Sequence, residues 1–219
     1  MTNTERIQAN NAELRKAIEM AEKLPDAGGG GNTDIEDGLI DGTLAGEYTN
    51  DRVTEFRRYA FYRCYDLTKV SAVNATTLGQ YALSECTSLV EINFPKAATV
   101  GQSVFVGCTS LVSAELPAAA TLYSNVFSGC AALKKVKCGS VKTINALAFA
   151  DCNNLEALIL DVDTICTLAN KSALSDTKIA KGGGYVYVHK NQLSGYSSAT
   201  NWSAYQFRAI EDYPKICGG

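Results

Sequence analysis

The sequence predicts a β-rich repeat solenoid with turns of 22 residues, preceded by an N-terminal α-helix. Five cysteines recur at intervals of 22 residues without slippage, at Cys64, Cys86, Cys108, Cys130 and Cys152. A fixed period of this length indicates that one supersecondary unit recurs, each copy being too small to bury its own apolar side. Stacking of neighbouring copies must therefore supply the core, and function must lie on a surface.

Apolar residues repeat together with the cysteines. A Leu follows each Cys after three residues, an apolar residue comes at the sixth place, and Phe or Leu lies three residues before each Cys. Another apolar place, the fourteenth, holds Leu78, Val100, Leu122 and Ile144. We therefore expect two short extended segments in each turn and a tight helical turn at the A-F-x-x-C piece. The 22-residue period ends after Leu160. Cys166 falls at the fourteenth place after Cys152, where the repeats have an apolar residue, and Leu174 stands where the period would place the next Cys.

The cysteines are expected to be reduced thiols in the core. Side chains on stacked strands point in parallel about 4.8 Å apart, whereas disulfide-bonded Cβ atoms lie ~3.8 Å apart and face each other. The chain starts with a polar segment, so we expect no secretion by a signal peptide. Zinc favours pairs such as C-x₂-C and calcium favours EF-hand spacing, and the sequence has neither. No metal or cofactor is predicted.

Composition and charge narrow the function classes. The chain has no apolar run approaching the ~18 residues of a membrane-spanning helix, so membrane insertion is not expected. A formal net charge of −3 gives no electrostatic reason to bind nucleic acid. His189 is the only histidine and follows a predicted strand, where an exposed strand end fits better than a general base. We predict that the chain is not an enzyme.

Residues 1–25 are predicted to form an attachment or oligomerisation helix, and residues 26–33 a glycine-rich linker. The stretch from Thr4 to Leu24 contains no Gly or Pro. Its apolar stripe consists of Ile7, Leu14, Ala17, Ile18, Ala21 and Leu24. Because such a stripe needs a partner, we expect either self-association into a homo-oligomer or docking on a larger assembly.

Caps are predicted at both ends of the solenoid, which spans residues 54–173. Residues 34–53 are turn-rich and cover the first open rung, and residues 174–219 close the other end. In this C-terminal cap, Tyr185–Val188 predicts a strand. Leu193 to Phe207 predicts a short amphipathic helix over the last rung, with Trp202 in the cap core.

Binding residues are expected beside the Leu and Val anchors, where side chains point outward and differ from turn to turn. The outward places are Thr68, Lys69, Ser71, Val90, Glu91, Asn93, Val112, Ser113, Glu115, Lys134, Lys135, Lys137, Glu156, Ala157 and Ile159. The sharpest local feature is the trio of Lys134, Lys135 and Lys137, which favours an acidic partner. The first turn adds an aromatic and basic border of Arg57, Arg58, Tyr59, Tyr62, Arg63 and Tyr65. Tyr and Arg are common interface anchors.

Three segments carry a resemblance to a known family. The run R-R-Y-A-F-Y-R-C-Y-D-L-T-K-V (57–70), the repeated C-T-S-L-V (86–90 and 108–112) and the ending Y-V-Y-V-H-K…Y-S-S-A-T-N-W-S-A-Y resemble BspA-like leucine-rich repeat proteins of bacteria and their phages. This resemblance covers residues 39–213 and implies a right-handed leucine-rich repeat solenoid that serves as a surface adhesin or interaction module. The segment I-Q-A-N-N-A-E-L with its L-P-D-A-G-G-G-G exit is similar to attachment segments of phage virion proteins of the tail or head.

Three functions remain open at this point. The leading hypothesis is a non-enzymatic, virion-associated adhesion or receptor-binding protein, made in the bacterial cytoplasm, whose helix binds other virion proteins and whose solenoid binds a host-surface glycan or protein. A structural capsid or tail decoration protein without receptor contact is the alternative. An intracellular bacterial interaction scaffold is the third.

Overall fold

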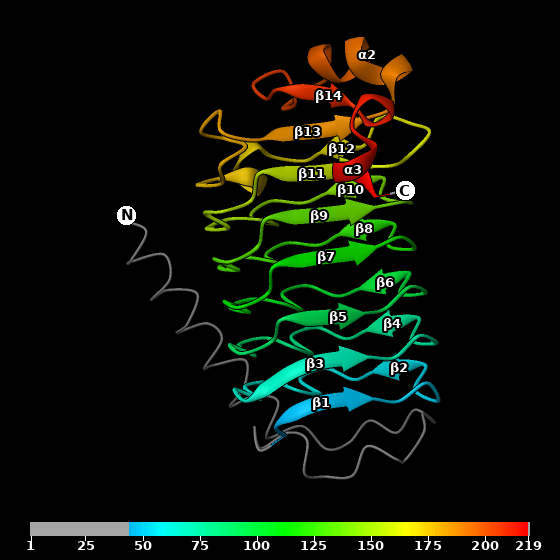
Figure 1. The fold of residues 1–219 in the computed structure, drawn as a ribbon, viewed down its shortest axis with the longest axis vertical. Helices are drawn as coiled ribbons and strands as arrows, with labels where there is room; N and C mark the ends of the chain where they lie inside the picture. Colours follow the sequence, from blue (N-terminus) through cyan, green and yellow to red (C-terminus); the bar gives the residue numbers. More distant parts are fainter. Residues whose placement is uncertain (1–43, 219) are drawn as a thin grey trace. The chain divides into compact units, whose positions relative to one another are not determined.

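The computed structural model describes residues 44–218, which form a β-solenoid of about seven turns (Figure 1). The predicted helix over residues 1–25, with its stripe from Ile7 to Leu24, lies outside the described residues. The same holds for the linker over residues 26–33 and for residues 34–43 of the predicted cap.

One side of the stack is a row of parallel strands that climbs the long axis of Figure 1. The row consists of β1 (Gly46–Thr49), β3 (Leu67–Ser71), β5 (Glu91–Asn93), β7 (Ser113–Leu116), β9 (Lys135–Cys138), β11 (Ala157–Leu160), β13 (Tyr185–Val188) and β14 (Phe207–Ala209). It divides into a three-stranded sheet, β1-β3-β5, and a five-stranded sheet from β7 to β14. Lys69 pairs with Glu91, so within the repeats the sequence period is also the strand register.

A second side is built from two-residue strands at the fourteenth place. These are β2 (Glu55–Phe56), β4 (Thr77–Leu78), β6 (Thr99–Val100), β8 (Thr121–Leu122), β10 (Thr143–Ile144) and β12 (Thr167–Leu168). They pair in parallel as β2-β4-β6 and β8-β10-β12, and the second residue of each strand is buried. The predicted pair of extended segments in each turn is thereby confirmed.

The third side, the A-F-x-x-C piece, is not the helical turn that we expected. Tyr59 and Arg63 have left-handed backbone angles (φ 62° and 61°), which a right-handed helix excludes. The conformation recurs at the same places in later turns, for example at Tyr81 and Glu85. The Phe61 N–H donates to the carbonyl of Ala82 in the next turn at 2.7 Å. The third side is therefore also hydrogen-bonded from turn to turn.

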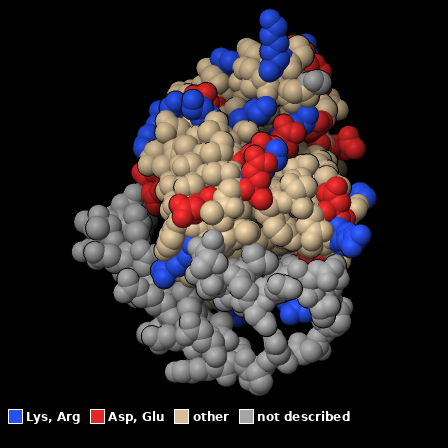
Figure 2. All heavy atoms as spheres, turned by 60° about the horizontal axis from the view of Figure 1, so that its bottom comes forward, with Lys and Arg blue, Asp and Glu red and all other residues tan. Residues whose placement is uncertain are grey.

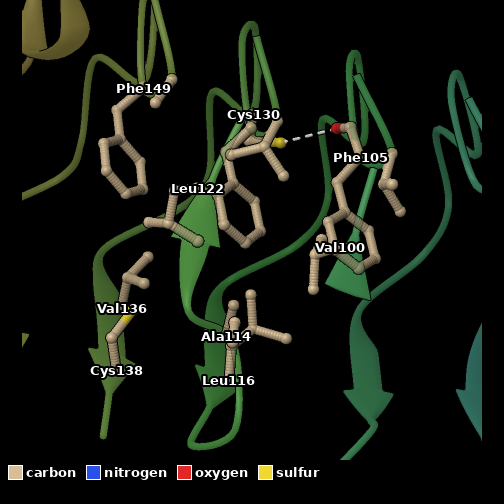
Figure 3. Close-up of a cluster of buried hydrophobic side chains, with 14 of the residues drawn as sticks. Val100, Phe105, Ala114, Leu116, Leu122, Cys130, Val136, Cys138 and Phe149 are labelled. Carbon is tan, nitrogen blue, oxygen red and sulfur yellow. Dashed lines mark hydrogen bonds between the residues drawn. The ribbon is translucent and has the colours of Figure 1, made fainter. Parts of the chain in front are cut away.

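Rings and thiols fill the interior (Figure 3). Phe105 stacks on Phe127 with centroids 5.1 Å apart, and Phe127 stacks on Phe149 at 5.6 Å. The Cys130 thiol donates to the Phe105 carbonyl at 3.0 Å. Three other thiols make the same bond to the preceding turn, those of Cys86, Cys108 and Cys152. All eight cysteines are buried and free, which confirms the expected reduced thiols.

The last turn contains inserted residues, and this shifts the fourteenth place. Leu122 pairs with Ile144, which lies one period later in the chain. One further period leads to position 166, but Ile144 pairs with Leu168, two places beyond it. The expectation that Cys166 takes this place is therefore wrong. Cys166 is buried instead beneath the C-terminal cap.

The expected place of the next cysteine is also shifted. The left-handed conformation of Asp151 (φ 62°) recurs at Asp176 (φ 63°), three places beyond the position that the period assigns. Leu174 therefore takes the place of the buried Phe rings, and the buried Thr177 takes the place of the thiol. The Thr177 hydroxyl donates to the Leu174 carbonyl at 2.8 Å.

The C-terminal cap begins with two further strands, since β14 pairs with β13. Only Leu193–Ser198 is α-helical (α2), so the helix predicted to reach Phe207 is too long: the backbone of Phe207 pairs with Val186. Short 3₁₀ helices cover Lys171–Leu174 (η2), Lys190–Gln192 (η3) and Ile210–Asp212 (η4), and α3 covers Pro214–Cys217.

Trp202 lies in the cap core, as predicted, and is fully buried. Its indole Nε1–H donates to the Cys166 carbonyl at 2.6 Å, and the Tyr196 hydroxyl accepts from the Cys166 N–H at 2.8 Å. The cap thus satisfies both backbone groups of one buried residue in the lengthened turn.

We predict that native thiols resist labelling. Burial raises the pKa of the Cys108 thiol and raises that of Cys138 to about 12, so both the reactive thiolate and access to it are lacking. Thiol titration should give negligible reaction in buffer and full reaction in denaturant. Rapid native labelling, or a mass that indicates disulfides, would contradict this arrangement.

Trp202→Phe should destabilise the fold by about 1–3 kcal/mol, because the Cys166 carbonyl loses its buried donor while the ring volume is mostly kept. Chemical denaturation followed by far-UV circular dichroism measures the change. Tyr123→Phe, at an exposed position, is the control and should change the free energy of unfolding by less than about 0.5 kcal/mol.

Candidate recognition surface

The outward face of the first row of strands gathers most of the predicted binding residues. We call this surface the strand face. One line along it consists of Lys69, Glu91, Ser113 and Lys135, and a second consists of Ser71, Asn93, Glu115 and Lys137. Parallel pairing in register puts residues of β3 beside those of β5, and residues of β7 beside those of β9. Ser71 is buried, so the expectation that it is available for binding is wrong.

Charges on the strand face are paired across turns. The distances from Nζ to the carboxylate oxygen are 2.9 Å for Lys69–Glu91, 3.9 Å for Lys135–Glu115 and 3.6 Å for Lys137–Asp161. The lysine trio is therefore not an isolated cationic patch: Lys134 is exposed just before β9, and the other two lysines have acidic neighbours. Acidic and basic side chains are also mixed on the surface in Figure 2, with larger uncharged areas between them.

The C-terminal segment covers part of the strand face. Ala157 and Ile159 point outward, as predicted, but they are buried in a second apolar cluster with Tyr187 and Cys217. The expectation that these two residues are available for binding is therefore wrong. The reason is that β11 and β13 carry apolar side chains on both faces, and α3 with its preceding residues shields the outer ones.

Polar contacts hold this segment in place. The Arg208 guanidinium lies 3.4 Å from the ring centroid of Tyr185 and 4.7 Å from that of Tyr213. The Lys137 ammonium donates to the Gly218 carbonyl at 3.0 Å. The Lys137 ammonium is thus partly occupied by a backbone carbonyl of the C-terminal segment.

His189 also helps to hold the C-terminal segment in place. Its Nε2 lies 3.1 Å from an Asp161 oxygen, and its Nδ1 lies 3.1 Å from a Glu211 oxygen. Glu211 also accepts from the backbone N–H of Lys190 at 3.1 Å. The ring therefore links the end of β13 to η4, a structural arrangement in which carboxylates engage both nitrogens.

The aromatic and basic border of the first turn is more buried than expected. Tyr62 is only 7% exposed, and burial raises the pKa of its hydroxyl to about 12, so it is not available as a surface anchor. Arg63 lies over the Tyr62 ring at 5.0 Å and pairs with Glu85 at 3.1 Å. Of the predicted border residues, Arg57, Arg58 and Tyr65 are exposed.

Sequence reasoning missed a groove on the strand face between β5 and β7. It has a volume of about 300 Å³. Its lining combines Val90, Glu91, Ile92, Asn93 and Pro95 of one turn with Ser113, Glu115 and Pro117 of the next. No sequence signal identified this groove: Pro95 and Pro117 stand at equivalent places, yet β5 still pairs with β3.

The described part of the chain holds no group of three or more His, Cys, Asp or Glu side chains arranged to bind a metal ion. Between residues 44 and 218, no helix is both long enough and apolar enough to span a membrane.

Comparison with protein-family models gives a match over residues 49–180 to the BspA type leucine rich repeat region, in six copies. The chain belongs to the BspA type leucine-rich repeat family. The match covers more than half of the 219 residues and includes the strands from β3 to β12. A leucine-rich repeat solenoid of this kind is typically a non-enzymatic interaction scaffold.

Solved structures agree with this assignment. A leucine rich cell surface protein of Faecalibacterium prausnitzii is 25% identical with a TM-score of 0.50, over 54% of this chain and 32% of that one. The pneumococcal vaccine antigen PcpA is 15% identical with a TM-score of 0.60, over 74% of this chain and 41% of that one, and supports the fold alone. The BspA type chain thus spans less than half the length of either. A comparison with curated protein sequences gives no match.

Acid should loosen the C-terminal segment of this BspA type solenoid. The hydrogen bond from its own backbone N–H, and next the His189 ring, lower the pKa of the Glu211 carboxyl from 4.5. A lowered folded-state pKa contributes stability that is present above pH 4.5 and is lost as pH falls through the lowered value. The thermal midpoint of the parent should therefore exceed that of Glu211→Gln at neutral pH, and the two should converge in acid. A constant difference across this range would contradict the assignment.

Proposed function

We propose that the chain is a non-enzymatic adhesion protein whose strand face binds a partner on a cell surface. The observation that carries the proposal is the open part of that face, from β3 to β9. There the buried anchors repeat, while the outward side chains change in charge and size from one turn to the next. Such a surface keeps the fold constant and leaves recognition free to vary.

The distribution of charges and the shielding by α3 together support a binding region limited to the open part of the strand face. The C-terminal end of the strand face is shielded by α3, and the ion pairs leave no strong excess of one sign on the rest. Selectivity on such a face comes from the arrangement of hydrogen-bonding groups and not from net charge. A host-surface glycan or protein is the partner class that we propose.

In its more specific form, the proposal places the protein on a phage virion. Residues 1–25 would attach it to other virion proteins and assemble a homo-oligomer, with Ile7, Leu14 and Leu24 on the contact stripe. What supports this form is the similarity of that segment to virion attachment segments. Its test is incorporation into particles, which deletion of residues 1–31 should abolish while the solenoid still unfolds at the same temperature. Incorporation of the deletion variant would contradict an attachment role.

Binding to host cells tests the recognition role. We expect saturable binding of the labelled full chain, reduced about tenfold when Lys69→Ala and Lys135→Ala are combined on the strand face. The control combines Arg57→Ala and Arg58→Ala in the first turn, and it should bind like the parent. Loss of binding in the control alone would move recognition to the first turn. Absence of binding by the parent, together with its presence in particles, would favour a decoration role.

A further inference from the structure

The solenoid has a break in its hydrogen-bonded ladders at one level. Within the described residues, no backbone hydrogen bond joins β5 to β7, although each is paired on its other side. On the second side, β6 and β8 do not pair with each other, and the nearest bond there is a long one of 3.5 Å from the Ala120 N–H to the Ala98 carbonyl. Figure 1 shows the wider spacing at this level.

Bonding continues on the third side at the same level. The Phe105 N–H donates to the Val126 carbonyl and the Gly107 N–H donates to the Ser128 carbonyl, both at 2.9 Å. The two turns are thus joined along the A-F-x-x-C edge and separated along the strand face. The groove lies where they separate.

An interior side chain accounts for the break. The proline that follows β7, Pro117, is not sufficient as a cause, because Pro95 lacks the same N–H one turn earlier and β5 still pairs with β3. Phe94 is buried where the turn before has Ala72, and its ring lies 5.6 Å from Phe56. A larger interior side chain here acts as a wedge.

The groove therefore contains polar groups that the solenoid itself leaves unpaired. Backbone donors and acceptors of β5 and β7 face the break without a strand partner. Beside them are the Ser113 hydroxyl, the Glu115 carboxylate and the Asn93 carboxamide, whose Nδ2 donates to the Ser71 hydroxyl at 3.1 Å, together with the apolar side chains of Ile92 and Pro117. Groups of this kind can bind a ligand that both donates and accepts hydrogen bonds.

The groove chemistry selects against two other ligand classes. A charged ligand has no uncompensated partner, because Glu91 pairs with Lys69 and Glu115 pairs with Lys135. An extended peptide would need a continuous strand edge, and Pro117 interrupts the ladder after a short run. A neutral compound with several neighbouring hydroxyls satisfies mixed donors and acceptors in a volume of about 300 Å³.

We infer that the groove between β5 and β7 is a binding site for a neutral saccharide unit, held by hydrogen bonds to Asn93, Ser113, Glu115 and the unpaired backbone groups. This rests on the proposed adhesion function and names the ligand class of its binding face. Apolar faces of the sugar ring would pack on Ile92 and Pro117.

Saturation-transfer NMR and calorimetry on the full chain test this site, with glucose, galactose, mannose and N-acetylglucosamine as probes. We expect saturable binding of at least one sugar. Ser113→Tyr fills the groove from an exposed position and should weaken that binding at least about tenfold, as should Glu115→Gln, which removes an acceptor at constant size. Ser140→Tyr, at another exposed serine, is the matched control and should bind like the parent.

Saccharide binding that survives both groove variants, or no saturable binding by any probe, overturns the site. Binding of an extended peptide that Ser113→Tyr abolishes, without sugar binding, replaces it with a peptide groove. Host-cell adhesion separates this inference from the function on which it rests. If the groove variants adhere like the parent, the site is wrong and the adhesion function stands. If sugar binds in the groove while the parent does not adhere to host cells, the saccharide site stands and the adhesion function is wrong.

Discussion

Hydrogen bonding from each turn to the next is the constraint on which this solenoid depends. A backbone group in one turn finds its partner about one repeat away in the chain, so neighbouring turns must match in shape wherever they pair. The constraint explains why left-handed residues recur at two fixed places in the repeats. It also explains the thiols. The carbonyl of Phe105 accepts both the Cys108 N–H of its own turn and the Cys130 thiol of the next turn, which no larger side chain could supply.

The 22-residue period was sufficient to predict the core and both rows of strands, because buried places demand one class of side chain. It could not predict the left-handed backbone conformation of the third side. One of the two left-handed places holds Tyr59, Tyr81, Ser103, Asn125 and Leu147, which share no chemistry, so their common conformation is set by the neighbouring turns and not by residue type. The lengthened last turn was hidden for a related reason. Leu174 fits the Phe place as well as any other apolar residue, and Thr177 does not resemble a cysteine.

The candidate surface was predictable in its location and less so in its character. Alternation identifies which side chains point outward, but partners such as Lys137 and Asp161 belong to different turns and meet only after stacking. The sequence also did not indicate that the C-terminal segment covers part of the strand face, because α3 packs there only after the chain has folded. The groove depends on the volume of Phe94 inside the solenoid, which a repeat of apolar places does not reveal.

The incomplete ladder at β5 and β7 has a mechanical consequence. A pulling force along the stack passes through every interface between turns in series, so each one bears the same tension. This interface keeps a row of short backbone hydrogen bonds on only one of its three sides, so it has the fewest bonds to share that tension. It opens first, about the A-F-x-x-C edge as a hinge. A chain under load would therefore extend at this level while the turns above and below keep their pairing.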